Sequence, residues 1–270
     1  MALLVRTWNL YHGNAKPPER GAFLEQMVRL ATADRPALLC LQELPVWALS
    51  RLEEWSGMHA ICDVAARPRF GPLPSTAALG RALTDLDHGM FRSAFAGQAN
   101  AILMTRQLRP VAHEKIVLNS WGFRRAQARW LDLDLVPRLA WAKERRVCQA
   151  VRVGLSDGST ALVANLHATA YDADERLADA ELRRAVSFVD ALARPQEPTI
   201  LCGDVNVRPG RSRTLADLRG WGWSELAPGI DQVLVRGAAS TPPEPWPEGR
   251  RSLDGRLLSD HAPVEAVVAA

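Results

Sequence analysis

Short apolar runs alternate with amphipathic segments through most of the chain, a pattern typical of strands alternating with helices. In the first third, this pattern predicts a strand over residues 2–8, a helix over 19–33, a strand over 37–42, a helix over 45–55 and a strand around 61–64. Pro45 supports the second helix, because proline is favoured in a first helical turn. The stretch from Arg67 to Gly80 is rich in proline and glycine and is predicted to be a long loop.

The same alternation continues to the end of the chain. Further strands are predicted over residues 101–104, 116–118, 147–153, 161–166, 199–202, 230–235 and 263–268, and further helices over 173–193 and 214–218. Asp157-Gly158 separates two of these strands by a turn and predicts a hairpin. The segments 161–166, 173–193 and 199–202 form a strand, helix, strand unit.

Alternating strands and helices favour an α/β sandwich in which helices cover packed sheets. The sequence contains neither an internal repeat nor an interdomain linker that we can identify. We therefore expect residues 1–270 to form a single domain. A domain of this size buries about 75% of its unfolded surface, so it needs no metal ion or disulfide in order to fold.

Composition narrows the class of protein. With 47% hydrophobic and 23% charged residues, the chain is typical of a globular protein, which excludes disorder, collagen and coiled coils. No run approaches the roughly 20 apolar residues that cross a bilayer. Arg6 and Asn9 also interrupt the N-terminal apolar run before it could be a signal peptide. We therefore expect a mature chain that starts at or near Met1, is not inserted into a membrane and lies in the cytoplasm.

The cysteines and the net charge give limited information about the compartment and the substrate. Cys40, Cys62, Cys148 and Cys202 lie far apart, so we expect free thiols, mostly buried, in a reducing compartment. The net charge of +3 permits a phosphate-bearing substrate but does not by itself indicate one.

Polar residues flank the apolar runs at six places. They are Asn9, Gln42-Glu43, Asn165-Leu166-His167, Gly203-Asp204-Val205-Asn206, Asp231 and Ser259-Asp260-His261. Strands that gather in one sandwich would bring these six segments together at one edge. Carboxylate and amide oxygens suit Mg²⁺ or Mn²⁺, whereas a zinc site needs closely spaced His or Cys ligands, which this sequence lacks. The set has the composition needed to bind a hard divalent cation and to cleave a phosphate ester.

The order of these segments, with Thr7-Trp8-Asn9 and Leu41-Gln42-Glu43 at the start, resembles the endonuclease/exonuclease/phosphatase superfamily, the deoxyribonuclease-I-like fold. Each segment alone is common, but six in the family's order are specific, and they span the chain from Asn9 to His261. The resemblance implies an α/β four-layer sandwich, with two packed mixed β-sheets flanked by helices. It also implies a Mg²⁺- or Mn²⁺-dependent phosphodiesterase.

The resemblance assigns a metal site and a water site. Glu43 corresponds to the carboxylate that holds the divalent metal, with Asp260 and Asn9 close to the ion directly or through water. Asp204 and Asn206 correspond to the pair that positions the attacking water and a phosphate oxygen. Physical chemistry agrees, because a metal ion and aimed donors stabilise the negative charge that develops on a phosphate during cleavage.

Two histidines complete the implied site. His261, oriented by Asp231, corresponds to the histidine that acts on the base side or binds the phosphate, and His167 to the general acid for the leaving oxygen. Imidazoles suit these roles because they gain and lose protons near neutral pH. Arg146 falls where relatives place an arginine that contacts phosphate, although Arg145 could fill the same place.

Each residue alone also has an ordinary structural explanation. Asn9 or Asn206 could be a turn residue, Glu43 a helix-start acid and His167 a core histidine. Three functions therefore stay open. The first, which we expect, is a nuclease that acts on DNA or RNA; the second is a small-molecule or lipid-headgroup phosphoesterase of the same superfamily; the third is a non-catalytic relative that binds partners. Tyr11 stands where abasic-site nucleases carry an aspartate, and no obligate protein partner is evident.

The segment from residue 121 to residue 146 interleaves basic and aromatic side chains. Its aromatic residues are Trp121, Phe123, Trp130 and Trp141. Such a segment can hold flexible nucleic acid; the alternative, which we favour, is a solvated strand and helix whose tryptophans pack in the core.

Arg208, Arg211 and Arg213 could bind a second phosphate near Asn206. The remaining histidines, His12, His59, His88 and His113, have no partner that the sequence identifies and are predicted to be loop or strand-surface residues.

Overall fold

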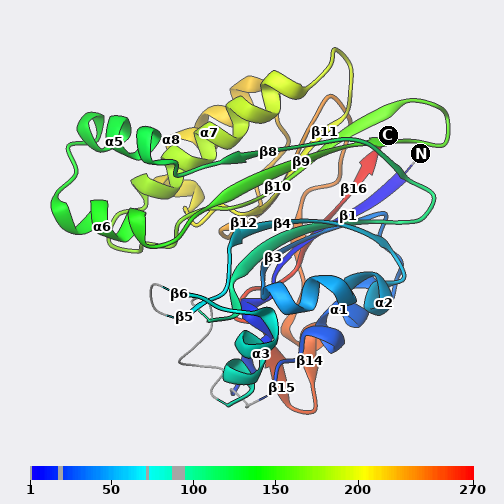
Figure 1. Ribbon diagram of the computed structural model, residues 1–270. Helices are drawn as coiled ribbons and strands as arrows, with labels where there is room; N and C mark the ends of the chain where they lie inside the picture. The colour runs from blue at the N-terminus through cyan, green and yellow to red at the C-terminus, as the bar shows by residue number, and fades with distance from the viewer. Residues whose placement is uncertain (1, 18–20, 71–72, 87–94) are drawn as a thin grey trace.

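Two β-sheets form the centre of the computed structural model, which describes residues 2–17, 21–70, 73–86 and 95–270 (Figure 1). One sheet contains β1 (Ala2–Asn9), β3 (Leu38–Leu44), β4 (His59–Ala66), β7 (Gln98–Met104), β13 (Glu244–Pro245) and β16 (Val264–Ala269). The other contains β8 (Arg109–Val117), β9 (Val147–Gly154), β10 (Thr160–His167), β11 (Thr199–Asp204) and β12 (Asp231–Arg236). Their strand orders are β13-β16-β1-β3-β7-β4 and β12-β11-β10-β9-β8.

Helices and short strands surround these sheets. The α-helices are α1 (Leu24–Thr32), α2 (Leu52–Ser56), α3 (Ala77–Leu86), α5 (Trp121–Trp130), α6 (Leu135–Lys143), α7 (Arg176–Leu192) and α8 (Arg213–Leu218). Short 3₁₀ helices lie at Tyr11–Gly13, Val46–Arg51, Pro209–Arg211, Arg219–Trp221 and Glu248–Arg251. The remaining strands are β2 (Ala15–Lys16), β5 (Arg69–Phe70), β6 (Leu73–Pro74), β14 (Ser252–Leu253) and β15 (Arg256–Leu258). No helix in the described part of the chain is long and apolar enough to cross a bilayer.

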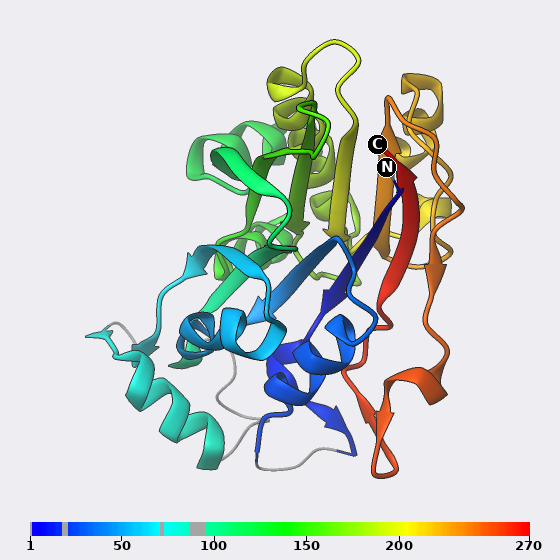
Figure 2. The ribbon, with the colours of Figure 1, turned by 90° about the vertical axis from the view of Figure 1, so that its right-hand side faces the viewer.

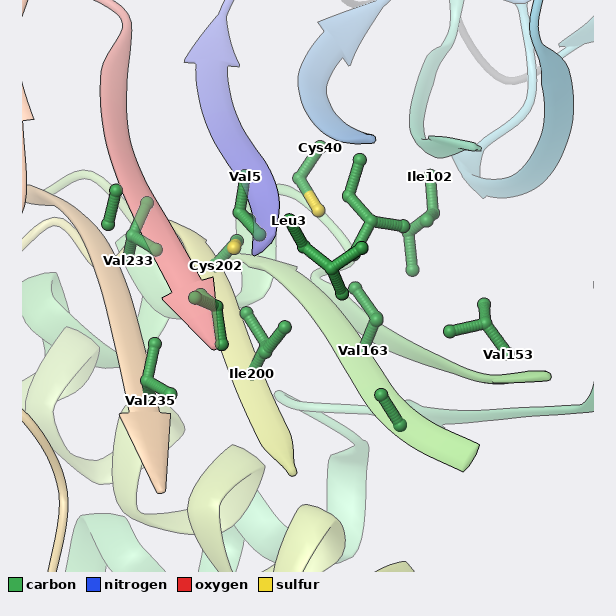
Figure 3. Close-up of a cluster of buried hydrophobic side chains, with 14 of the residues drawn as sticks. Leu3, Val5, Cys40, Ile102, Val153, Val163, Ile200, Cys202, Val233 and Val235 are labelled. Carbon is green, nitrogen blue, oxygen red and sulfur yellow. The ribbon is translucent and has the colours of Figure 1, made fainter. Parts of the chain in front are cut away.

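The main core lies between the two sheets. Successive side chains of a strand point to opposite faces, so every second apolar residue of a strand enters this layer. Val5 and Cys40 meet Val163 and Cys202 there (Figure 3). The outer faces are covered by helices, α1 and α2 on the six-stranded sheet and α7 and α8 on the five-stranded sheet. These four layers confirm the sandwich that the sequence predicts.

Most predicted elements are present, including the hairpin of β9 and β10 and the parallel unit of β10, α7 and β11. Two predictions are wrong. The expected long loop 67–80 contains β5, β6 and the start of α3, and the segment 121–146 forms two helices in place of a strand and a helix. The four cysteines are free, as predicted, and all but Cys62 are buried.

The topology of the sheets places the strand ends that carry the candidate residues. β1 runs parallel to β3, and β10 runs parallel to β11. β16, β7, β9 and β12 are antiparallel to these neighbours, so their first residues lie beside the last residues of β1, β3, β10 and β11. One end of the sandwich, far from both termini in Figure 1, therefore collects polar residues from both sheets.

Candidate active site

Strand ends from both sheets meet at the carboxylate of Asp204, the last residue of β11. Its Oδ2 atom accepts a hydrogen bond from Asn9 Nδ2 at 2.9 Å, and it lies 3.6 Å from His167 Nε2 and 3.9 Å from His261 Nε2. The three partners come from the end of β1, the end of β10 and the turn before β16. A single oxygen atom that is buried from solvent thus joins three segments that are far apart in the sequence.

The backbone before Asp204 is shaped by a glycine. Gly203 has a φ of 135°, and a Cβ atom there would lie 2.0 Å from the carbonyl oxygen of Leu166. Only glycine avoids that overlap, so β11 can approach β10 at the point where His167 and Asp204 pair in register.

His261 forms an ion pair with two aspartates. Its Nδ1 atom lies 2.8 Å from Asp231 Oδ2, and its Nε2 atom faces Asp204. Burial disfavours the charge on His261, but Asp204, Asp231 and Asp260 outweigh burial and raise the pKa of His261 to about 10. Burial is also the main cause that raises the pKa of Asp204 to about 6, while His261 opposes it. At neutral pH the site therefore holds an imidazolium between carboxylates.

His167 has different surroundings. Its Nδ1 atom lies 3.0 Å from Gln98 Nε2, and Arg146 Nη1 lies 2.9 Å from Nδ1 and 3.2 Å from Nε2. Donation from the Gln98 amide to Nδ1 assigns the proton of the neutral ring to Nε2. Burial first, and then the charge of Arg146, lower the pKa of His167 well below its usual value. The Nε2 atom points toward Asp204 and toward Glu43 Oε1, 3.6 Å from each.

Glu43 lies at a break in the sheet. The register of β3 against β7 shifts between Leu41 and Leu44, and Glu43 takes a left-handed φ of 54°. This bulge re-aims the side chain, as bulges beside functional sites commonly do. Its carboxylate faces the Nε2 atoms of His12, at 3.5 Å, and of His167.

Asn206 and Asp260 occupy the edge of the site. The Asn206 backbone N–H donates to Asp204 Oδ1 at 3.0 Å, and its Nδ2 atom donates to the carbonyl of Ala168. Asp260 is exposed, and its Oδ1 atom lies 4.0 Å from His261 Nε2. All nine residues singled out in the sequence thus lie at the same end of the sandwich.

The site contains two groups of side chains that could bind a divalent cation. Asp204, Asp231 and His261 offer ligand atoms within 4.8 Å of one another, but the proton that His261 holds between its carboxylates makes this imidazole a poor ligand. Glu43 is a better candidate, because the contacts described for its carboxylate are imidazole nitrogens 3.5 and 3.6 Å away, and a hard oxygen donor suits Mg²⁺ or Mn²⁺. The residues present therefore fit a hard divalent ion on the Glu43 side.

Two cavities flank this row of residues. One, of about 620 Å³, is lined by Asp231, Asp260 and His261. The other, of about 260 Å³, is lined by Glu43 and Arg146, with His12 and Gln98 beside them. Asp204, which contacts residues of both groups, lies between them. A phosphate held at Asp204 would have space on both sides.

Sequence reasoning missed two residues of the site. His12 was predicted to be a surface residue, but it is buried and faces Glu43, because the 3₁₀ helix after β1 folds back beside β3. Gln98 opens β7 and contacts His167. A signal existed for Gln98, since it is a polar residue at the start of a buried strand that pairs antiparallel with β3.

The structure also places the other polar residues. His113 on β8 and His59 at the start of β4 are strand residues with accessible side chains, as predicted. Each also has a partner that the sequence did not identify: Asp63 lies 2.6 Å from His113, and Glu53 lies 3.7 Å from His59. His88 lies outside the described residues. Arg208 and Arg211 both pair with Glu175, which reduces the charge that they could offer to a second phosphate.

The choice between two neighbouring arginines is also clear in the structure. Arg146 is buried against His167, whereas Arg145 is exposed. Of the tryptophans in the same segment, Trp141 is buried as we favoured, but Trp121 and Trp130 are exposed.

Comparison with known proteins adds independent information. Residues 7–261 match the Endonuclease/Exonuclease/phosphatase family, while no curated protein sequence matches the chain significantly. Similar solved structures include a mannosyl-6-phosphatase of Bacteroides thetaiotaomicron, with 16% identity, a TM-score of 0.65 and coverage of 99% of this chain and 100% of that chain. The human Nocturnin catalytic domain with bound sulfate has 15% identity, a TM-score of 0.64 and coverage of 99% and 94%. Truncated TDP2 of Caenorhabditis elegans has 14% identity, a TM-score of 0.61 and coverage of 100% and 98%. At these identities the likeness shows the fold.

Proposed function

Because this chain belongs to the Endonuclease/Exonuclease/phosphatase family and is thus a phosphoester hydrolase, we propose that it is a Mg²⁺- or Mn²⁺-dependent phosphodiesterase. The observation that carries the proposal is the position of Asp204 Oδ2, within 4 Å of both His167 and His261. A carboxylate between two imidazoles can orient a water molecule while one group on each side exchanges protons with the reacting oxygens.

The residues take the following roles. Asp204, fixed by Asn9 and by the N–H of Asn206, orients the attacking water. His261, held at Nδ1 by Asp231, presents Nε2 to a phosphate oxygen. These groups come from separate strands and need little rearrangement, because each already has a hydrogen bond that fixes its direction.

The leaving-group side is formed by other residues. His167 presents Nε2 toward the centre of the site and is proposed as the general acid for the departing oxygen. Its pKa is low in the free protein, so this role requires that the negative charge of a phosphate bound beside it favours the protonated imidazolium. Arg146 supplies a fixed positive charge beside it. Glu43 would hold the metal ion, with Asp260 and Asn9 close to the ion directly or through water. The ion, when bound, stabilises the charge that develops on the oxygens of the substrate phosphate.

A phosphodiester fits this site better than a terminal phosphate does, because cavities lie on both sides of Asp204 and leave room for both ester groups. We propose DNA or RNA as the first substrate class, since the two ester groups of an extended chain could each occupy one of the cavities. A small-molecule or lipid-headgroup phosphodiester is the second candidate. It is favoured by the pairing of Arg208 and Arg211 with Glu175, which leaves less free charge for a polyanion.

Glu43→Gln tests the proposal. This change keeps the shape of the side chain and removes the charge that attracts a cation, so metal-dependent turnover should fall by at least about 10²-fold, the scale of losing one catalytic group. The assay compares bis(p-nitrophenyl) phosphate, plasmid DNA and single-stranded RNA, each with Mg²⁺, with Mn²⁺ and with chelator. Glu25→Gln, at an exposed position of α1, is the matched control.

Wild-type rates for Glu43→Gln at limiting Mg²⁺ would contradict the assignment of the metal ligand. Full activity of the unchanged protein in excess chelator would contradict metal dependence as such. The relative rates on the three substrates decide between the substrate classes.

A further inference from the structure

The hairpin of α5 and α6 leaves large apolar side chains exposed to solvent. They are Trp121 (68% exposed), Trp130 (75%), Leu135 (69%), Val136 (64%) and Leu139 (60%). Figure 1 shows both helices at one end of the five-stranded sheet, beyond the ends of β8 and β9. Exposed apolar residues are ordinary when they are scattered singly, but a concentration of them on one short segment indicates a contact site.

The helix α6 is apolar on two opposite faces. Its inner face buries Trp141, which packs against Leu177 of α7. Its outer face carries Leu135 and Leu139 one turn apart, with Val136 beside them. A surface helix normally turns an apolar stripe to the core and a polar face to solvent, so the exposed apolar residues of α6 depart from that pattern.

The helix α5 adds aromatic and basic groups to this exposed side. Arg125 lies over the ring of Trp121, with its guanidinium carbon 5.2 Å from the ring centroid. Arg129 and Trp130 are exposed at the other end of the helix. We call the exposed apolar and basic residues of these two helices the hairpin surface; they are Trp121, Arg125, Arg129, Trp130, Leu135, Val136, Arg138, Leu139 and Lys143.

Basic residues outnumber acidic residues in this segment. Residues 121–145 contain six basic and three acidic residues, which leaves a net charge of +3, the whole formal net charge of the protein. None of the six basic side chains in this segment forms a salt bridge within the described part of the chain. The hairpin surface therefore combines exposed apolar groups with unneutralised positive charge.

We propose that the hairpin surface docks onto lipid bilayers that contain anionic lipid. Helices that lie in a membrane interface carry apolar side chains flanked by Lys and Arg, and bind through apolar burial together with attraction to anionic headgroups. Tryptophan is favoured at the same depth, because its ring is apolar and its N–H is polar. On α6, Arg138 and Lys143 flank the exposed aliphatic residues, which is the arrangement found in helices that lie in a membrane interface.

Two other occupants fit less well. Single-stranded nucleic acid would use the arginines and the two tryptophans, but Leu135, Val136 and Leu139 offer no ring on which a base could stack. A second copy of the chain would bring two surfaces of net positive charge together, which disfavours their association. An anionic bilayer satisfies the apolar and the charged residues at once.

Docking would also place the catalytic cleft near the membrane. Ala140 and Lys143 of α6, and Glu144 after it, line the cavity that contains Glu43 and Arg146. The hairpin surface and the cleft thus share one helix. The inference about docking does not depend on the proposed hydrolysis, because vesicle binding is measured without turnover.

Sedimentation of the full chain with vesicles tests the proposal. Vesicles of phosphatidylcholine with about 30% phosphatidylserine should bind the protein at least tenfold more tightly than pure phosphatidylcholine, and binding should weaken with salt because attraction to the headgroups is screened. Leu135→Ser combined with Leu139→Ser should weaken binding at least tenfold, as should Arg125→Glu combined with Arg129→Glu. Val111→Ser combined with Arg109→Glu, on the far part of β8, should bind like the wild type.

Hydrolysis of soluble bis(p-nitrophenyl) phosphate by the Leu135→Ser, Leu139→Ser variant shows that it is folded, since neither residue lies in the site. The proposal is overturned if the wild type ignores anionic vesicles. It is equally overturned if the hairpin variants lose binding to single-stranded DNA while the wild type binds no vesicles, or if they convert a dimer to a monomer with no effect on vesicles. Loss of hydrolysis on Glu43→Gln with vesicle binding unchanged would separate the two functions.

Discussion

Glu43 shows how a single residue can be held in a costly conformation at a functional site. A left-handed φ of 54° in a residue with a side chain costs of the order of 1 kcal/mol or more and persists only where the surroundings impose it. Here the bulge in β3 imposes it, and the result is a carboxylate that faces His12 and His167 instead of the helix-covered face of the sheet, to which Leu39 and Leu41 point. Asn206 is held in the same way, with a φ of 49° directly after β11.

The two histidines beside Asp204 are expected to act as one catalytic unit. His167→Ala and His261→Ala should each reduce kcat by about 10²-fold or more, the usual scale of acid and base catalysis. Because both act in one transition state, the double variant should lose less than the product of the single losses. Steady-state kinetics on one diester substrate measures all three variants.

A substrate with a good leaving group distinguishes the two roles. It should rescue His167→Ala, since that residue protonates the departing oxygen, but not His261→Ala. Equal rescue of both variants would show that the roles are assigned wrongly. His59→Ala, at a half-exposed position on β4, is the control for loss of a histidine outside the site.

The sequence predicted the candidate residues better than it predicted their neighbours. Asp204, His167 and His261 stood at the ends of apolar runs and in an order that resembles a known family. His12 carried no such pattern, because its placement depends on how the turn after β1 folds back. Gln98 stood at the start of an apolar run, but its contact with His167 depends on which strand pairs with β3. Tertiary contacts of that kind are not encoded in local spacing.

At the scale of the elements, Gly203 controls how closely β11 approaches β10. Gly203→Ala would place a Cβ atom against the carbonyl of Leu166 and demand a φ that alanine avoids. We expect the free energy of unfolding to fall by about 1–3 kcal/mol, the cost of strain at special backbone positions, and kcat to fall because Asp204 is displaced. Urea unfolding and diester hydrolysis measure the two effects.

Gly210 offers a matched control. It lies in a 3₁₀ helix on the surface, and a Cβ atom there would meet nothing within 4 Å. Gly210→Ala should leave both stability and activity close to those of the wild type. Equal effects at the two glycines would show that the close approach at Gly203 is not the cause.

The buried residue Arg6 links β1 to β16 and to the segment that follows α1. Arg6 of β1 is fully buried and binds Asp34, after α1, at 2.7 Å and Glu265 of β16 at 2.8 Å from its Nε atom. The hydrogen bond from Arg6 is the main cause that lowers the pKa of Asp34. Burial opposes the charge of Glu265, but hydrogen bonds from Trp246, Arg6 and Arg250 outweigh burial and lower its pKa.

This network predicts how stability depends on pH. Both carboxyl groups have a lower pKa in the folded state than in the unfolded chain, where they titrate near about 4. Their contribution is therefore fully present above that pH and is lost as the pH falls through the folded pKa values. Urea unfolding from pH 6 to pH 2 should show this loss, and Glu265→Gln should make it smaller. Glu114→Gln, exposed on β8, should leave it unchanged.

Local pattern predicted strands better than helices in this chain. Buried strands such as β3 and β11 are continuous apolar runs and are easy to recognise. For residues 121–146 we favoured a strand and a helix, not the two helices α5 and α6, because exposed tryptophans and leucines obscure the usual division into an apolar and a polar face. The exposed apolar residues that made these helices hard to predict are the same residues that indicate a contact surface.

At the scale of the whole molecule, an amide side chain links the two sheets behind the site. Asn165 of β10 accepts from Gln42 Nε2 at 2.7 Å, and its Nδ2 atom donates to the carbonyls of Leu41 and Ala101 in the other sheet. These contacts fix the position of one sheet relative to the other. They lie close to the site, because Asn165 is two residues before His167 on β10 and Gln42 is next to Glu43 on β3.

Asn165→Leu should therefore affect both stability and catalysis. It leaves buried polar groups without partners, each at a cost of about 1–3 kcal/mol, so the free energy of unfolding should fall by at least about 2 kcal/mol. Activity should fall even under conditions where the variant is fully folded, because residues from the two sheets no longer align. Gln107→Leu, at an exposed turn, is the control, and a variant that is destabilised but fully active would contradict a role for Asn165 in alignment.

The pairing of β1 with β16, in which Ala2 lies opposite Ala269, has a consequence for synthesis of the chain (Figure 2). A ribosome makes β1 before every other strand of the sheets and β16 after them, so one edge of β1 stays open while the rest emerges. His261 precedes β16 and reaches Asp204 only when that last strand docks. Under the proposed mechanism, the nascent protein therefore lacks the imidazolium beside Asp204, and we expect no hydrolysis until that last strand has docked.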